Sequence, residues 1–343
     1  MLIIEADNVN DAYPKGLTLI NNLGFLTPSR GGQVLRLPGP VVTEYMHPQE
    51  RVLFDERRDA NPFFHLFEAI WMLGGRNDVK FPATFAKHIA TFSDDGETLN
   101  GAYGHRWREH FGVDQINLAI AQLVKDPLDR RVVIGMWDPY IDQTIAEAGG
   151  KDVPCNTHVY FATNVVGELD MTVCNRSNDM VWGAYGANMV HMSILQEYVA
   201  LCVGLPLGVY YQMSNNLHVY ERHFDLVKAA STDLVGHDPY QGYGEVAVSP
   251  EPLFDRVGGE TKFQFDRDVL SFLDDPGQLG NNYLTGFFKD TIDPMYKSWQ
   301  LHKSGLHTSA MEKIEQVESS DWRLAGKLWL ARRPPKVKTL SAL

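Results

Sequence analysis

Residues 152–188 read DVPCNTHVYFATNVVGELDMTVCNRSNDMVWGAYGAN and carry a cysteine behind a proline, two apolar runs and a polar cluster. The apolar runs 158–166 and 168–174 meet at Gly167, which predicts a β-hairpin. The polar cluster Arg176-Ser177-Asn178-Asp179 follows the second run directly. A thiol, a guanidinium, a hydroxyl and a carboxylate therefore come from one short piece of chain, which indicates a candidate site.

The flanking sequence predicts elements that would support this segment. Residues 187–203 form the longest apolar helical pattern, and residues 61–73 form another that Gly74-Gly75 would end. We expect strands over 33–37, 131–136 and 209–213, a turn over 99–108, a short helix over 117–125, and loops with short helices after residue 225. Residues 1–28 give no strong pattern. Because no repeat or linker is visible, we expect one large domain over residues 1–343.

Composition narrows the function classes. A hydrophobic content of 44% with 22% charged residues is typical of a globular protein with a sizeable core. The net charge of −12 disfavours nucleic acid as a partner, and no apolar run approaches the roughly 20 residues of a membrane span. The acidic N-terminus does not look like a secretory signal. The three cysteines show no metal-binding spacing, so we expect no metal and a reducing, cytoplasmic location.

Taken singly, the reactive side chains have ordinary alternatives. Cys155 is more often a small buried residue than a nucleophile, and His158 would point to the opposite face of a strand, which disfavours a Cys–His protease pair. Glu68 lies inside an apolar helix, where a glutamate is usually exposed; if buried, it would have a raised pKa suited to proton transfer. Tyr103 alone would be an aromatic anchor.

Several arginines are placed for phosphate binding. Arg30 precedes Gly31-Gly32, Arg130 and Arg131 are adjacent, and Arg176 precedes Ser177. A guanidinium beside glycine amides or a hydroxyl suits a phosphate group. An anionic small substrate is therefore compatible with the acidic chain, because local charge outweighs distant charge at short range.

These residues together resemble the thymidylate synthase superfamily, whose members use folate to add one carbon to C5 of a pyrimidine nucleotide. The resemblance covers about residues 25–225, with a divergent part over 226–343. The matching motifs, in chain order, are Arg30-Gly31, Glu68-x-x-Trp71, Tyr103-Gly-x-x-Trp107, Asp126-x-x-x-Arg130-Arg131, Pro154-Cys155, Arg176-Ser177-x-Asp179, Gly183-x-x-x-x-Asn188 and His218-x-Tyr220. The resemblance implies an α/β (α+β) three-layer fold with a large mixed sheet covered by helices.

The resemblance also implies a role for each matching residue. Cys155 would attack C6 of the pyrimidine, Glu68 would organise water and protons, and Tyr103 would assist removal of the C5 proton. The remaining roles would be phosphate binding by Arg30, Arg176 and Ser177, base recognition by Asn188, sugar binding by His218 and Tyr220, and folate binding by Asp179 and Trp71. A homodimer is implied, in which Arg130 and Arg131 reach the partner's phosphate. The co-substrate would be 5,10-methylenetetrahydrofolate.

Three departures from the family pattern favour hydroxymethylation over methylation. Asn156 replaces the histidine expected after the cysteine, the loop between Gly183 and Asn188 has one extra residue, and the chain ends in LARRPPKVKTLSAL instead of a short apolar run. These changes lie where the family reads the base or excludes water, and hydroxymethylation requires water to add. The alternatives are a thymidylate synthase acting on dUMP and a non-catalytic nucleotide-binding protein. The choice among dUMP, dCMP and CMP remains open.

Overall fold

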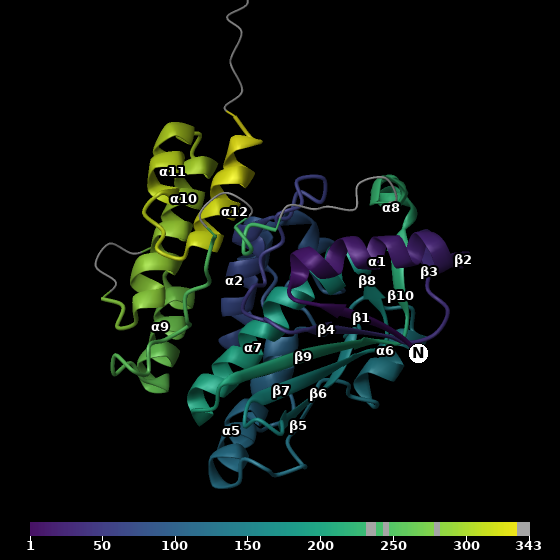
Figure 1. Cartoon of the computed structure of the whole chain (residues 1–343), viewed down its shortest axis with the longest axis horizontal. Helices are drawn as coiled ribbons and strands as arrows, with labels where there is room; N and C mark the ends of the chain where they lie inside the picture. The colour runs from purple at the N-terminus through teal and green to yellow at the C-terminus, as the bar shows by residue number, and fades with distance from the viewer. Residues whose placement is uncertain (231–237, 243–246, 278–281, 335–343) are drawn as a thin grey trace, which may run out of the picture.

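A computed structural model describes residues 1–230, 238–242, 247–277 and 282–334 (Figure 1). Its larger sheet has six strands in the order β1 (Leu2–Ala6), β4 (Val41–Tyr45), β9 (Leu207–Ser214), β7 (Leu169–Asn175), β6 (Asn156–Thr163) and β5 (Val133–Gly135). The sheet is mixed, because β1 with β4 and β7 with β9 are parallel pairs and the other neighbours are antiparallel. The hairpin predicted around Gly167 is confirmed as β6 and β7.

A smaller sheet completes the β-structure beside the first. Its order is β2 (Phe25–Ser29), β3 (Gly32–Arg36), β10 (Leu217–Tyr220) and β8 (Asn178–Asp179). The two-residue strand β8 pairs in parallel with β10, so that Asp179 lies opposite His218. This pairing brings the polar cluster Arg176-Ser177-Asn178-Asp179 next to the His218-x-Tyr220 motif.

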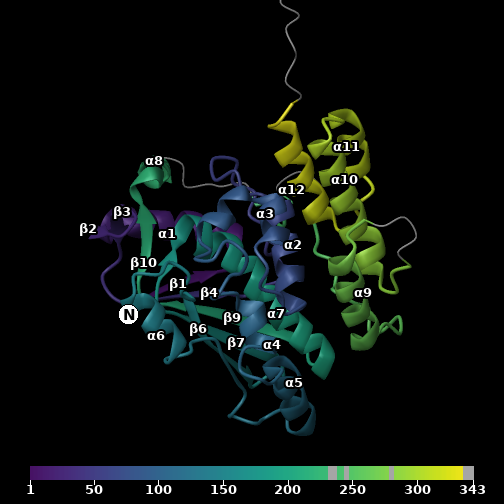
Figure 2. The same ribbon diagram turned by 180° about the vertical axis from the view of Figure 1, so that it is seen from behind.

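The helices form two layers over one face of the larger sheet. Helix α7 (Asn188–Val203) packs on β7 and β9, and α2 (Pro62–Leu73) packs on α7. A C-terminal group packs outside α2: α9 (Lys262–Asp274), α10 (Asp293–Lys303), α11 (His307–Ile314) and α12 (Ser320–Ala331). Figures 1 and 2 show α2 between α7 and this group from both sides. The predicted three-layer α/β fold with a large mixed sheet is confirmed.

The remaining helices lie around these layers. They are α1 (Val9–Leu23), α3 (Lys80–Phe85), α4 (Tyr103–Arg108), α5 (Gln115–Lys125), α6 (Ile141–Glu147) and α8 (Phe224–Ala230). Short 3₁₀ segments cover Lys87–Thr91 and Glu221–His223, and π-helical segments cover Met180–Ala187 and Phe287–Ile292. In the described residues, no helix is both long and apolar enough to span a membrane.

Local sequence signals explain the helices that position the site. At the start of α2, the Asn61 side chain accepts a hydrogen bond from the Phe64 backbone N–H, and Pro62 occupies the first turn, where a missing N–H costs nothing. Helix α7 ends at Gly204, whose φ of 88° is the left-handed conformation that glycine adopts without strain. Both boundaries agree with the predicted ones.

The structure corrects several expectations. Residues 99–108 are not all turn, because Tyr103 begins α4, and residues 1–28 contain β1, α1 and most of β2. The part after residue 225 contains α9, of 13 residues, and three further helices, more regular structure than expected. Of the C-terminal run LARRPPKVKTLSAL, residues 335–343 lie outside the described residues.

Candidate active site

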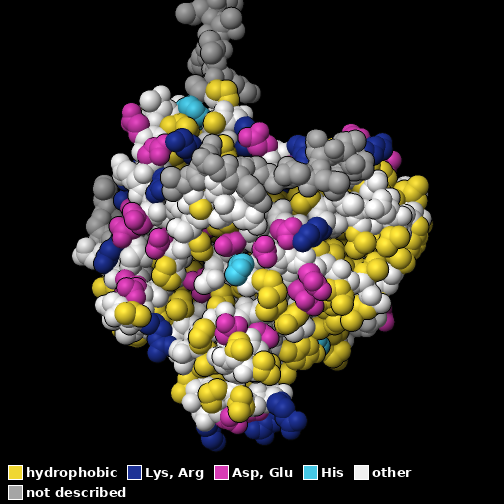
Figure 3. Space-filling model, in the orientation of Figure 1, with side chains coloured by type: hydrophobic (Ala, Val, Ile, Leu, Met, Phe, Trp, Pro, Cys, Tyr) yellow, Lys and Arg dark blue, Asp and Glu magenta, His cyan; other side chains and the backbone are white. Residues whose placement is uncertain are grey.

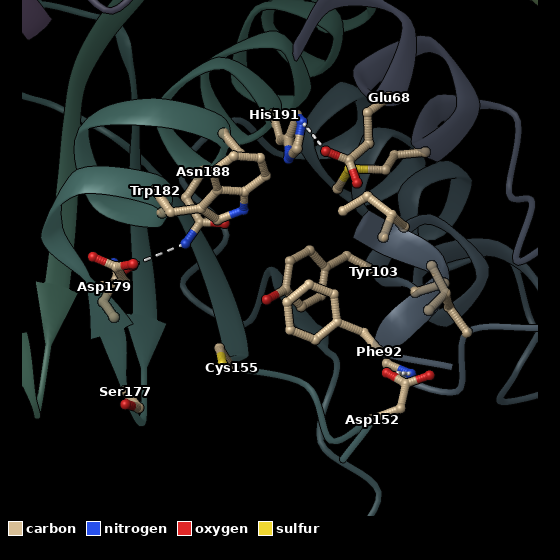
Figure 4. A pocket seen from close by; sticks show the side chains of 18 of the residues that line it. Glu68, Phe92, Tyr103, Asp152, Cys155, Ser177, Asp179, Trp182, Asn188 and His191 are labelled. Atoms are coloured by element: carbon tan, nitrogen blue, oxygen red, sulfur yellow. Dashed lines mark hydrogen bonds and ion pairs between the residues drawn. The ribbon is translucent and has the colours of Figure 1, made fainter. Parts of the chain in front are cut away.

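A cavity of about 250 Å³ lies where α2, α4, α7 and the N-terminal end of β6 meet (Figure 4). Seven residues named from the sequence line it: Glu68, Trp71, Tyr103, Cys155, Ser177, Asp179 and Asn188. They come from positions up to 120 apart in the chain, so the fold gathers into one space the motifs that the sequence displays separately.

Cys155 lies just before β6, and Arg176 holds its surroundings in place. The Arg176 guanidinium donates hydrogen bonds to the Pro154 and Val153 carbonyls, both at 2.8 Å, and its Nη2 lies 3.7 Å from the Cys155 Sγ. Burial raises the pKa of the Cys155 thiol, while the charges of Arg176 and Arg30 lower it. The arginine is therefore placed to stabilise a thiolate that burial alone would disfavour.

Tyr103 stands beside Cys155. Its hydroxyl accepts a hydrogen bond of 3.4 Å from the Asn156 backbone N–H, and burial raises its pKa, so the phenol is neutral at ordinary pH. Asp152 lies on the same side of the cavity and was missed from the sequence. Burial raises the pKa of its carboxyl to about 6, although the Gly101 N–H donates to it at 2.9 Å.

Glu68 and His191 form a polar pair on the opposite side of the cavity (Figure 4). The Glu68 Oε2 lies 3.0 Å from the His191 Nε2, and the two side chains are only 14% and 4% exposed. Glu68 is therefore partly buried in the cavity wall rather than on an exposed helix face. Sequence reasoning missed His191, although its place three residues after Asn188 on a helix is a signal that both share a face.

The cavity also has aromatic walls. Trp71 donates from its indole N–H to Asp78 at 3.1 Å, which fixes the ring, while Phe92 lines the lower right in Figure 4. Trp182, which was not predicted, is held by a ring contact with His88 at 4.5 Å and by the Arg58 guanidinium at 5.4 Å. Three large rings thus give this cavity flat apolar surface.

Asp179, His218 and Tyr220 lie together on β8 and β10, but only Asp179 lines the cavity. Burial lowers the pKa of His218, and its Nδ1 lies 3.3 Å from the Asn216 carbonyl. Arg222, which the sequence did not single out, lies over the Tyr220 ring at 4.6 Å with its Nη2 3.6 Å from the Asp179 carboxylate. The group therefore borders the cavity from its β8 side.

The predicted phosphate arginines separate into two groups. Arg30, in the turn between β2 and β3, donates to the Gly150 carbonyl at 3.1 Å, and its charge reaches Cys155. Arg130 and Arg131 precede β5 on the exposed surface, where Arg131 bonds to Asp129 at 2.8 Å. Arg130 and Arg131 do not line the cavity of their own chain.

The extra residue between Gly183 and Asn188 lies in a kinked π-helical segment, Met180–Ala187, rather than in an open loop. The Asn188 N–H bonds to the Gly183 carbonyl, five residues back, where an α-helix would use Ala184. Tyr185 and Gly186 take non-helical backbone angles within this segment. The insertion thus leaves Asn188 at the start of α7 and lining the cavity, which agrees with its predicted position.

Asn156, in the place of the expected histidine, is fully buried next to Cys155. Neither its amide nitrogen nor its amide oxygen has a hydrogen-bond partner among the described residues. Buried amides usually bond to protein or to ordered water. Across all the residues that the structure describes, no three His, Cys, Asp or Glu side chains are grouped closely enough to hold a metal ion.

Comparison with known proteins agrees with this geometry. Residues 61–238 match the thymidylate synthase family. A deoxyuridylate hydroxymethyltransferase of Pseudomonas phage M6 is 42% identical over 341 residues, 97% of this chain and 95% of the relative. A protein of the same name from Bacillus phage SP01 is 36% identical over 230 residues, 64% of this chain and 59% of the relative. A putative thymidylate synthase of Methanosarcina barkeri is 29% identical over 228 residues, covering 66% and 93%.

The match spans more than half of the chain, and the similarity to the Pseudomonas phage M6 protein extends over nearly all of it. Cys155 lines the cavity with six other residues that the family motifs indicate. The predicted folate-dependent transferase acting at C5 of a pyrimidine nucleotide is thereby confirmed, and the chain belongs to the thymidylate synthase family.

Proposed function

We propose that this chain hydroxymethylates dUMP at C5, using the one-carbon unit of methylenetetrahydrofolate and water. The observation that carries the proposal is the 42% identity, over nearly the full length of both chains, to a protein named deoxyuridylate hydroxymethyltransferase. The polar pair of Glu68 and His191 in the cavity supports it, because water must add to the new carbon.

The first step is the addition of the Cys155 Sγ to C6 of the pyrimidine. A new S–C6 bond makes C5 a carbon nucleophile, which forms a bond to the incoming carbon. Arg176, 3.7 Å from the sulfur, stabilises the thiolate that attacks. Arg176 also stands next to Ser177 at the cavity, and we assign both, with Arg30, to the 5′-phosphate.

The other substrate contacts follow from position. Asn188, buried at the start of α7, reads the base edge, while His218 and Tyr220 on β10 bind the sugar hydroxyl. His218 is suited to this role because its lowered pKa keeps the ring neutral, with one donor and one acceptor.

The residues present fit a folate ring. Trp71, Phe92 and Trp182 supply aromatic surface, and the Asp179 carboxylate lines the same cavity. A flat heterocycle with N–H donors matches an aromatic wall next to a carboxylate. We assign Trp71 and Asp179 to folate binding; the folate supplies a carbon at the oxidation level of formaldehyde.

Proton transfer and water addition complete the reaction. Attack by C5 breaks one of the two C–N bonds that hold the carbon on the folate. Tyr103, beside Cys155, then assists loss of the C5 proton. The electrons left on C5 break the second C–N bond, so that tetrahydrofolate leaves and an exocyclic methylene remains on the nucleotide. A water held by Glu68 and His191 adds its oxygen to that carbon and gives a proton to the pair, and the electrons move into the ring. These electrons then form the 5,6 double bond again and break the S–C6 bond, which releases the Cys155 thiolate.

We propose that the protein acts as a homodimer through the uncovered face of the larger sheet. Helix α7 packs on the other face, while Ile3, Val133 and Tyr160 on this one are 54%, 42% and 41% exposed. In Figure 3, hydrophobic side chains gather where Figure 1 places β6 and β7. Arg130 and Arg131, exposed beside the edge strand β5, would then reach the partner's phosphate site. Light scattering of wild type and of Tyr160→Glu tests this, since the charge should give monomers; a monomeric wild type contradicts the proposal.

We also propose that residues 1–343 form one domain. The core is one cluster of buried side chains that includes Ile4 of β1, Phe67 of α2 and Leu330 of α12. Calorimetry should therefore record a single unfolding transition, whereas two separate transitions would argue for two domains.

Mass spectrometry of the products tests the reaction itself. The purified protein is incubated with methylenetetrahydrofolate and dUMP, dCMP, UMP or CMP. We expect dUMP to gain a hydroxymethyl group with release of tetrahydrofolate. Formation of a methyl group with dihydrofolate would instead establish the alternative, a thymidylate synthase, which the Methanosarcina barkeri similarity favours.

A further inference from the structure

A chain of three buried amides leads from the cavity into the larger sheet. Asn188 Nδ2 donates to Asn178 Oδ1 at 3.0 Å. Asn178 Nδ2 donates to Gln212 Oε1 at 3.0 Å and to Ser214 Oγ at 3.1 Å. The three side chains are 8%, 2% and 1% exposed, so water does not compete for these bonds. We call Asn188, Asn178 and Gln212 the amide relay.

The relay ends at a backbone carbonyl, and this end fixes its direction. Gln212 Nε2 donates to the Ala184 carbonyl at 3.1 Å. A carbonyl only accepts, so the nitrogen of Gln212 must face it and the oxygen must face Asn178. The nitrogen of Asn178 must then face Gln212, and its oxygen must face Asn188. Each amide is therefore oriented by the next one in the chain of hydrogen bonds, so the assignment of oxygen and nitrogen in all three side chains follows from the Ala184 carbonyl.

The inserted residue explains why the Ala184 carbonyl takes part. In a regular α-helix it would accept from the Asn188 N–H, but the π-helix directs that N–H to Gly183. Ala184 instead accepts side-chain donors, Gln212 and the Tyr45 hydroxyl, from β9 and β4. The relay also requires a glycine at position 183, because an added Cβ would lie 2.6 Å from Asn178 Oδ1.

A fixed amide at Asn188 distinguishes two bases. Uracil presents an N3–H donor next to an O4 acceptor, and cytosine presents an N3 acceptor next to an N4 donor. The covalent bond to Cys155 and the phosphate contacts fix the ring, so the base edge does not turn over. If the Asn188 oxygen faces N3 and its remaining N–H faces the group at C4, the amide bonds to both groups of uracil. With cytosine the same amide would set acceptor against acceptor at N3 and donor against donor at N4.

We propose that Gln212 and Asn178 are positioning residues that determine base selectivity by fixing the Asn188 amide. The inference rests on the proposed function, in which Asn188 reads the base and the favoured nucleotide is dUMP. It extends selectivity beyond Asn188 to Asn178, which lines the cavity beside it, and to Gln212, which does not line the cavity and lies on a strand 24 residues beyond Asn188.

The test compares kcat/KM for dUMP and dCMP in wild type and in Gln212→Met. Methionine keeps the volume of the side chain but neither donates to Ala184 nor orients Asn178. We expect the ratio of the two kcat/KM values to fall by roughly tenfold or more, because Asn188 then adopts both orientations. Asn178→Ser, whose hydroxyl both donates and accepts, should lower the ratio in the same direction and serves if Gln212→Met does not fold.

Gln196→Met is the matched control. Gln196 is buried on α7 and donates to the Leu169, Gly208 and Val209 carbonyls, but it takes no part in the relay. This variant should affect both substrates alike and leave the ratio unchanged. A ratio that is also unchanged in a folded Gln212→Met or Asn178→Ser, or a wild type without preference, would overturn the inference.

The outcome also separates this inference from the proposed substrate. If the wild type prefers dCMP and the preference collapses in Gln212→Met, the proposed substrate is wrong and the relay is supported. If the wild type prefers dUMP and Gln212→Met keeps that preference, the proposed substrate stands and the relay is rejected.

Discussion

Two sides of the same cavity are held in different ways. On the nucleophile side, Arg176 is anchored directly to the Pro154 and Val153 carbonyls, and the groups involved lie within 24 residues of one another. On the base side, Asn188 is oriented through other side chains, Asn178 and Gln212, before a backbone carbonyl is reached. Disturbing the first side should therefore stop the chemistry, whereas disturbing the second should change which base reacts.

The largest effect is expected for Cys155→Ala. Without the sulfur, C5 is not activated, and turnover should fall by roughly 10⁴-fold or more, as when a covalent nucleophile is removed from other enzymes. Nucleotide binding, measured by calorimetry, should persist. Cys174→Ala is the control, because Cys174 lies outside the cavity on β7. Turnover that survives in Cys155→Ala would refute the covalent mechanism.

Arg176→Ala should affect both binding and reactivity. Loss of a charge-assisted phosphate contact should weaken nucleotide binding by about 2–3 kcal/mol. The positive charge lowers the pKa of Cys155, so its removal should raise that pKa, and alkylation by iodoacetamide should shift to higher pH. The control is Arg256→Ala, which removes a guanidinium bonded to the Leu201 carbonyl, away from the cavity. An unshifted alkylation profile would deny Arg176 its role beside the thiol.

Gly183→Ala should disturb the base side. The added Cβ would lie 2.6 Å from Asn178 Oδ1 and 3.2 Å from Asn188 Nδ2, so the relay must shift. We expect a loss of about 1–3 kcal/mol in unfolding free energy and a lower selectivity between dUMP and dCMP. Gly135→Ala, where the nearest atom is 3.8 Å away, is the control. Unaltered selectivity in a destabilised Gly183→Ala would count against the relay.

Asp152→Asn should give the smallest effect, visible in the pH dependence of stability. Burial raises the pKa of Asp152 from 3.8 to about 6, so the folded protein binds this proton more tightly than the unfolded chain does. Stability from this group is present at low pH and declines as pH rises from about 4 to about 6. Asparagine removes that decline, so the variant should melt higher than wild type at pH 8, with a smaller difference at pH 4. An equal difference at both pH values would contradict the assignment.

Local signals were sufficient where a few neighbouring residues decide the structure. Gly167 between two apolar runs identified the hairpin, and Asn61-Pro62 with Gly74-Gly75 identified both ends of α2, because turns and caps depend on short-range backbone chemistry. The same signals failed for Tyr103, which glycines made look like part of a turn. They also failed for α1, which contains Pro14 near its middle.

In the site, too, some residues were identified from local sequence signals and others were not. Motif order in the sequence identified seven residues that line the cavity, among them Cys155 and Asn188. It did not identify His191 or Arg222, whose importance depends on partners, Glu68 and Asp179, that lie 123 and 43 residues away in the chain. A lone histidine on an apolar helix gives no sign of a buried carboxylate on another helix.

The sequence by itself therefore determined the family, the central hairpin and the boundaries of α2 and α7, because these depend on residue identity and short spacings. Only the tertiary structure decided how the inserted residue is absorbed and what orients Asn188. The insertion could have looped out; the backbone instead forms a π-helix whose Ala184 carbonyl meets Gln212 from β9. Such a contact depends on strand register and burial together, since a hydrogen bond between distant segments exists only once the sheet and the helix are packed.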